Sequence, residues 1–196
     1  MPAASGQKIK VLLAGGTVSL RELRPEDVSE RYVRWLNDPQ VNQFLETRFE
    51  AHTLAGVRSY VQSIKAEKNE ILWGIFLKMD GAHVGNIKLG PVHPRHKFAY
   101  IGLMIGEKDY WGKGIAAQAI ALVTKYAFEE LKLHKLLAGC YEPNVGSLRA
   151  FEKCGFHIEG TEKSQWLYEG KYIDSYRMAF INPGEGVLEK GKLNQE

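Results

Sequence analysis

The sequence reads YWGKGIAA from Tyr110 to Ala117, between a strand-like run at 99–105 and a long helix-like run at 115–131. The two glycines in this stretch let the backbone pass close to a bulky anion. The first turn of the following helix leaves backbone N–H groups unpaired and adds the positive end of the helix dipole, which favours a phosphate. The stretch therefore predicts a loop that holds the pyrophosphate of a nucleotide-like compound.

The residues around this loop predict one mixed α/β unit, because apolar periodicities of strands and helices alternate along the chain. We expect strands at 18–23, 71–79, 82–89, 99–105 and 136–141, and two more around Glu169-Gly170. We expect helices at 25–36, 53–66, 115–131 and 144–153. The order β α α β β β α β α β β predicts a mixed sheet with helices on both faces. Residues 1–16 are interpreted as a flexible arm, 17–181 as the domain and 182–196 as a polar tail.

Composition limits the class of protein. The 196 residues suit one domain, and 44% hydrophobic and 25% charged residues are ordinary for a soluble globular enzyme. The net charge of +3 is mild and its lysines and arginines are scattered, so no nucleic acid is expected as a partner. No apolar run is long enough for a membrane span or a signal peptide, which predicts a cytoplasmic protein that binds no membrane. Cys140 and Cys154 predict no disulfide framework.

Two other phosphate-binding loops are disfavoured. Gly112, Gly114 and Ala117 formally match the dinucleotide fingerprint, which would indicate an NAD-dependent reductase. However, residues 106–111 separate the strand from the glycines, and too few residues follow Glu142 to complete that fold. A Walker loop is excluded because no Gly-Lys-Ser/Thr is present.

The loop closely resembles the acyl-CoA loop of the GNAT superfamily (GCN5-related N-acetyltransferases), and the resemblance covers roughly residues 17–181. A second signature of that family is an Asn followed by a helix that ends in Glu-Lys-x-Gly-Phe, and here it spans Asn144 to Phe156. Trp111 replaces the usual Gln or Arg and is typical of the branch with ribosomal-protein N-terminal and amino-sugar acetyltransferases. The stretches 32–41 and 84–91 are also similar to that branch. The resemblance implies the GNAT fold, an α+β architecture with a mixed, mostly antiparallel seven-stranded sheet.

By this resemblance, the co-substrate is acetyl-CoA. The backbone of 112–116 would hold its pyrophosphate. Lys113 would add charge at the rim, a solvated lysine being the other interpretation. A bulge at Gly102 would separate the central strand from the next one, so that the backbone of 103–105 pairs with pantetheine. Asn144 would cap its helix and contact the pantetheine arm. The expected cofactor-binding residues are Leu103, Met104, Ile105, Trp111, Gly112, Lys113, Gly114, Ile115, Ala116 and Asn144.

The implied reaction is direct attack of a primary amine on the thioester. Phe151 stands where many family members have the tyrosine that protonates the thiolate, so either Ser147, Tyr141 or a water substitutes for it, or the reaction needs no acid. Glu46 is the candidate base, although a surface carboxylate is the other interpretation. Ser147 and Glu46 are thus the candidate catalytic residues.

The acceptor is expected to be a small-molecule amine, and a nucleotide-linked amino sugar is the first candidate. The α-amine of a protein such as a ribosomal subunit is the alternative, and a CoA-binding module without catalysis remains a rival because of Phe151. The candidate acceptor-side residues are Trp35, Arg48, Asn86 and His96, although Trp35 also suits the core. No metal is expected, because His93 and His96 have no evident third ligand. The sequence leaves the oligomeric state open, a homodimer included.

Overall fold

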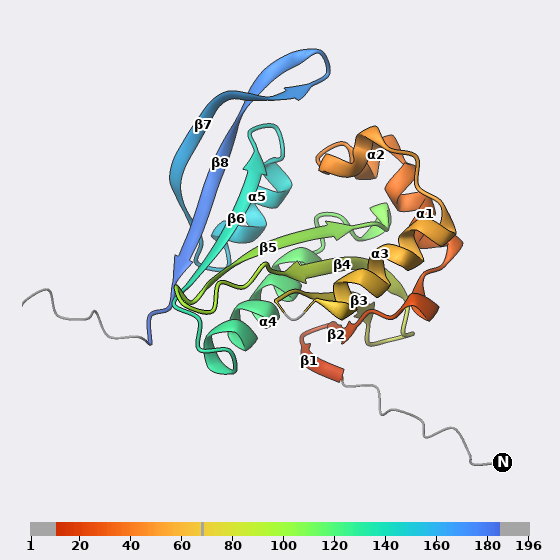
Figure 1. Ribbon diagram of the computed structural model, residues 1–196, viewed down its shortest axis with the longest axis horizontal. Coiled ribbons are helices and arrows are strands. Elements are labelled where there is room, and N and C mark those ends of the chain that lie inside the picture. The colour runs from red at the N-terminus through yellow and green to blue at the C-terminus, as the bar shows by residue number, and fades with distance from the viewer. Residues whose placement is uncertain (1–10, 68, 185–196) are drawn as a thin grey trace, which may run out of the picture.

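An eight-stranded sheet in the order β1-β2-β3-β4-β5-β6-β8-β7 organises the protein (Figure 1). The computed structural model describes residues 11–67 and 69–184. The strands are β1 Val11–Gly15, β2 Val18–Glu22, β3 Ile71–Leu77, β4 His83–Leu89, β5 Phe98–Ile105, β6 Lys135–Tyr141, β7 His157–Tyr168 and β8 Lys171–Ile181. The helices are α1 Glu30–Asn37, α2 Pro39–Asn42, α3 Leu54–Ala66, α4 Ile115–Glu129 and α5 Val145–Glu152. Short 3₁₀ turns lie at η1 Pro25–Asp27, η2 Glu46–Phe49 and η3 Lys108–Tyr110.

The predicted fold class is confirmed, with one strand more than expected. The β5–β6 pair is parallel, whereas the other neighbouring strands of the described chain pair in antiparallel fashion. The additional strand β1 falls in the segment interpreted as a flexible arm. Gly16 adopts a positive φ of 53° in the turn between β1 and β2, so the glycine pair belongs to a hairpin. Residues 1–10 and 185–196, the rest of the expected arm and tail, lie outside the described residues.

The helix expected over 25–36 is divided in two. Pro25 opens only the turn η1, Val28 is extended, and Ser29 then caps α1 by accepting a hydrogen bond from the N–H of Tyr32. The cap places four apolar side chains of α1 against the sheet: Tyr32, Val33, Trp35 and Leu36.

Helices cover the two faces of the sheet in two separate apolar clusters. Helices α4 and α5 pack with β5 and β6 in one cluster, which includes Ile101, Ile120 and Leu136. Helices α1 and α3 pack on the opposite face, over Leu72 and Met104. We call these the α4 face and the α1 face. None of the helices in the described ranges is long and apolar enough to cross a membrane.

Gly106 follows β5 and lies directly against the indole of Trp35, so that a Cβ at this position would overlap the ring. We expect Gly106→Ala to lower the free energy of unfolding by about 1–3 kcal/mol, because α1 would have to move away from the sheet. Gly139→Ala is the matched control, since a Cβ there meets no atom within 4 Å. Chemical denaturation measures both, and equal stabilities of the two variants would contradict this close packing.

Candidate active site

The strands β5 and β6 pair only at their starts. Phe98, Ala99 and Tyr100 pair with Lys135, Leu136 and Leu137, after which the two strands diverge (Figure 1). β5 continues to Ile105 while still paired with β4, and β6 continues to Tyr141 while paired with β8. We call the unpaired region between them the β5–β6 opening.

The backbone of β5 alternates between β4 and this opening. The C=O of Tyr100 accepts a hydrogen bond from Gly90, and the N–H of Gly106 donates to Val84. Even-numbered residues therefore direct their backbone groups to β4, and Leu103 and Ile105 direct theirs to the opening. Met104 is thus placed wrongly among the expected backbone contacts, because its own backbone groups belong to the β4 ladder.

Gly102 does not form the expected bulge. The register of β4 against β5 runs without a shift from Gly85 opposite Ile105 to Leu89 opposite Ile101. The strands separate without an inserted residue, so the bulge expected at Gly102 is wrong. Beyond the strand, the C=O of Ile105 accepts a hydrogen bond of 2.8 Å from the indole N–H of Trp111. Trp111 therefore ties the glycine loop to the end of β5.

The glycine loop has the geometry of an anion site. Gly112 and Gly114 have positive φ values of 71° and 75°, and a Cβ at either would meet no atom within 4 Å. Gly114 occupies the cap position of the 15-residue helix α4 and offers no side chain to it. In the described chain the N–H groups of Gly112, Gly114, Ile115 and Ala116 have no acceptor. Free donors at a helix start fit a diphosphate.

Lys113 is the one charged side chain of this loop. Its ammonium group lies 5.3 Å from the centre of the Tyr110 ring, within the range of a cation–π contact. This contact holds the lysine next to the free N–H groups, where it adds positive charge to the rim.

Helix α5 borders the opening from the side of β6. The side chain of Asn144 accepts a hydrogen bond of 3.2 Å from the N–H of Ser147, as a helix cap does. The Ser147 hydroxyl lies 3.4 Å from the thiol of Cys140, whose pKa is raised by burial. Phe151 is 1% exposed and packs edge-on against Phe156, so it is a core residue. Its ring has no hydroxyl that could donate a proton.

Arg48 joins the turn η2 to the strands β6 and β7. Its side chain is 11% exposed and donates to the backbone C=O of Leu45 and of Leu167, at 2.8 Å and 2.9 Å, and to the hydroxyl of Tyr141 at 3.4 Å. Glu46, 57% exposed, forms an ion pair with it at 3.1 Å. The structure thus gives Arg48, expected as an acceptor-side residue, a bridging role, and places Glu46 in a surface ion pair.

Aromatic contacts reinforce this bridge between η2 and the β6–β8–β7 strands. Phe44 stacks on Tyr168 with ring centres 5.4 Å apart and meets Tyr141 edge-on. The hydroxyl of Tyr168 donates to the side chain of Gln43 at 2.9 Å. We call this set, with Arg48, the η2 bridge.

Trp35 and Asn86 are buried and not on an open acceptor surface. The indole N–H of Trp35 donates to Glu107 at 3.1 Å, which holds α1 against the end of β5. The side-chain oxygen of Asn86 lies 2.9 Å from Nε2 of His83, and its Nδ2 has no partner among the described residues. His83 itself lies between the rings of Phe76 and Trp35, at 4.9 Å and 5.0 Å.

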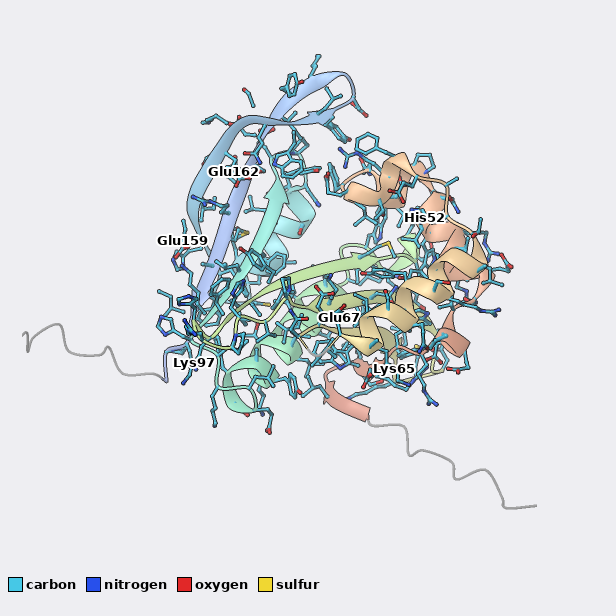
Figure 2. The ribbon with its side chains drawn as sticks, in the orientation of Figure 1. His52, Lys65, Glu67, Lys97, Glu159 and Glu162 are labelled. Carbon is cyan, nitrogen blue, oxygen red and sulfur yellow. The ribbon has the colours of Figure 1, made fainter. Side chains whose placement is uncertain are left out.

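His96 lies at the wrong end of β5 for an acceptor-side residue. It precedes Phe98, where β5 and β6 are still paired, and its ring faces Phe98 and His93. β5 extends about 23 Å from there to Ile105, at roughly 3.3 Å per residue. Lys97, labelled in Figure 2, marks this closed end. The expected position of His96 near the acceptor is therefore wrong.

A polar cluster on the β7–β8 hairpin was missed in the sequence. Trp166 donates to Ser175, and Ser175 donates to Glu162, on the same face as Tyr141. The rings of Tyr141 and Trp166 pack beside this cluster, with their centres 5.4 Å apart. Asp174 forms an ion pair of 2.6 Å with Lys163, and this hydrogen bond lowers the pKa of the Asp174 carboxyl.

The sequence profile of one protein family, described as "Acetyltransferase (GNAT) domain", matches residues 17–157. The chain belongs to the GNAT acetyltransferase family. It is an N-acetyltransferase with the GNAT fold.

Similar proteins of known sequence or structure support this family assignment. A probable N-acetyltransferase, YjcK of Bacillus subtilis (strain 168), is 33% identical over 180 residues, which cover 89% of this chain and 99% of the relative. The spermidine N(1)-acetyltransferase of Escherichia coli (strain K12) is 28% identical over 88% of this chain and 95% of its own length. The structure of Mycobacterium smegmatis RimJ in complex with CoA-disulfide is 25% identical, with a TM-score of 0.73 over 85% of this chain and 82% of that one.

Burial lowers the pKa of His83 from its ordinary value of 6.5, although Asn86 opposes part of this shift. A histidine with a depressed pKa in the folded state binds fewer protons than in the unfolded state. Its contribution to stability is complete above pH 6.5 and is lost as the pH falls through the folded value. We expect His83→Gln to reduce the decline of the free energy of unfolding below pH 6.5, as measured by urea denaturation at stepped pH. An equal decline in both proteins would contradict this role.

Proposed function

We propose that the enzyme transfers the acetyl group of acetyl-CoA to a primary amine of a small molecule. The observation that carries the proposal is the row of free N–H groups at Gly112–Ala116 beside the unpaired edge of β5. The first element fits the diphosphate, and the second fits the extended amide chain of pantetheine as an added strand. The relative that was solved with a CoA compound supports this assignment.

The contacts assigned to the co-substrate follow from this geometry. Gly112, Gly114, Ile115 and Ala116 would donate to the diphosphate through their backbone, and Lys113 would add charge at its rim. Leu103 would pair with pantetheine through both backbone groups, and Ile105 through its N–H alone because Trp111 occupies its C=O. The Asn144 cap would border the same arm.

The chemistry needs little from side chains. An alkylamine has a pKa of about 10.4 and must lose a proton before its lone pair can attack the thioester carbon. When the C–S bond breaks, the leaving thiolate takes the second amine proton or one from a donor, because its thiol has a pKa of about 8.5. We propose Ser147 as that donor, since it lies four residues before Phe151 and hence on the same side of α5. Glu46 remains a proposal for the base, its carboxylate shared with Arg48.

Several acceptors stay open within this class. The sequence favours a nucleotide-linked amino sugar, with the α-amine of a protein as the alternative. Polyamines are a further candidate class of acceptor, because one E. coli relative is named a spermidine N(1)-acetyltransferase. A CoA-binding module without catalysis is the rival from another class, favoured by the buried Phe151. Transfer of labelled acetyl groups to a panel of amines separates these, because a silent module would bind acetyl-CoA without turnover.

Gly114→Ala tests the loop. A Cβ there extends into the space assigned to the diphosphate, so we expect acetyl-CoA to lose its thermal stabilisation of the protein. In the wild type that stabilisation is about 2.7 kcal/mol at a hundredfold excess over the dissociation constant.

The control is Gly170→Ala, in the β7–β8 turn. Gly170 has the same φ of 75° as Gly114, and a Cβ there also meets no atom within 4 Å. Both variants therefore carry the same backbone strain, about 1–2 kcal/mol. If acetyl-CoA stabilised the two variants equally, the assignment of the loop would be overturned.

Ser147→Ala tests the proton donor. We expect kcat to fall about tenfold, with the KM for acetyl-CoA unchanged, because a thiolate can also leave unprotonated. Cys140→Ser, at the neighbouring buried thiol, is the control for local packing. A Ser147→Ala enzyme with the wild-type kcat would exclude this role.

A further inference from the structure

A chain of hydrogen bonds on the α1 face ends on one carboxylate. The indole N–H of Trp166 donates to the Ser175 hydroxyl at 3.0 Å, and that hydroxyl donates to Oε2 of Glu162 at 2.7 Å. Both donors are neutral, so the chain fixes the carboxylate in place without cancelling its charge. Within the described ranges, the other oxygen, Oε1, forms one ion pair, with the Nε of Arg177 at 3.9 Å, and no hydrogen bond. The side chains of Glu162 and Arg177 are 29% and 68% exposed, which makes their mutual attraction weak.

Cross-strand pairing places this carboxylate beside the β5–β6 opening. Tyr141 of β6 lies opposite Ser175 of β8, which in turn lies opposite Glu162 of β7. Tyr141 is on the strand that borders the opening. Neighbouring strands lie about 4.8 Å apart, so Glu162 is two strand spacings, about 10 Å, from that border. Its bond to Ser175 draws the carboxylate back toward β6, which leaves a span of roughly 5–10 Å.

Tyr141 stands in the row between β6 and Glu162, and its ring packs against Trp166. Nearer the paired starts of β5 and β6, the edges of the opening carry glycines. Gly102 and Gly139 are each two residues beyond the last β5–β6 pair, Tyr100 with Leu137. Both glycines are exposed, and a Cβ at either would meet no atom within 4 Å. Neither has a positive φ, so no backbone constraint requires glycine there. Glycine within a strand weakens it and often marks a position where a ligand comes close.

We propose that Glu162 binds the second, distal positive charge of an extended amine acceptor, whose reacting nitrogen reaches the thioester through the β5–β6 opening. The inference rests on the proposed function, because it takes the opening as the place of reaction. It selects diamines and polyamines whose charges lie about 5–10 Å apart over monoamines. Arg177 acts in the opposite direction, because its guanidinium repels the ammonium group that Glu162 attracts.

The test compares cadaverine with pentylamine, a monoamine of equal length, and adds spermidine as a longer polyamine. We expect Glu162→Gln to raise the KM for cadaverine and spermidine roughly tenfold to a hundredfold, the range for a lost hydrogen bond to a charged group. The KM for pentylamine should not change. Arg177→Gln should lower the KM for the two polyamines, an opposite sign that a loss of structure would not produce.

Glu159→Gln is the matched control. Glu159 lies on the same strand, as Figure 2 shows, but its carboxylate pairs with Lys135 at 2.6 Å and 2.7 Å. This variant should behave as the wild type with all three amines. Gly139→Leu should raise the KM for every amine, since its side chain would cover the path to the opening, and should leave the thermal shift with acetyl-CoA intact.

The outcomes separate the inference from the proposed function. A Glu162→Gln enzyme with unchanged polyamine kinetics, or a wild type that does not prefer cadaverine to pentylamine, would overturn the role of Glu162. In either case a retained thermal shift with acetyl-CoA leaves the proposed function standing. If acetyl-CoA did not stabilise the wild type, the assignment of the glycine loop to the diphosphate would be wrong, and the proposed function would be overturned as well.

Discussion

The divergence of β5 from β6 after three paired residues is the constraint on which the rest of the structure depends. A strand in the middle of a sheet normally satisfies its backbone groups on both sides, and an unpaired N–H or C=O costs free energy when water is excluded. Leu103 keeps such groups free in the described chain, while Trp111 satisfies the C=O of Ile105. The structure therefore maintains, in the middle of the sheet, an edge that an extended ligand can complete.

Three sets of contacts hold this edge open. On the α4 face, α4 and α5 pack under β5 and β6 in one apolar cluster, which fixes the two strands separately. On the α1 face, Trp35 anchors α1 to the end of β5 through Glu107. At the far end, the η2 bridge joins the segment after α2 to Tyr141 and Leu167, and the charge of Arg48 strengthens its hydrogen bonds. β5 and β6 are thus held directly at their paired starts, and at the other end of the opening they are held through α1 and the η2 bridge.

The sequence predicted those parts of the molecule that local patterns determine. The strands β2 to β8, helices α3 to α5 and the glycine loop follow from periodicity, caps and turn residues, each within a few positions. β1 was missed because Gly15-Gly16 indicates a flexible segment as well as a tight hairpin turn, and only pairing with β2 decides between them. His96 was misplaced for a similar reason, because no local pattern states at which end of β5 the strands separate. Trp35 and Arg48 are in the expected region, but tertiary contacts occupy their polar groups.

The diphosphate loop could be predicted from the sequence, whereas the acceptor side of the site could not, and this difference has a physical cause. A diphosphate bound by backbone N–H groups requires glycines at fixed spacing before a helix, and such a requirement can be read along the chain. The acceptor side depends on rows of side chains across β6, β8 and β7, which come from segments far apart in the sequence. β7 also changes register between Glu162 and Trp166, so that these two residues can share Ser175 although they are four positions apart. A register change of this kind leaves no mark in the sequence, which is why the Glu162 cluster emerged only when the pairing of the strands was known.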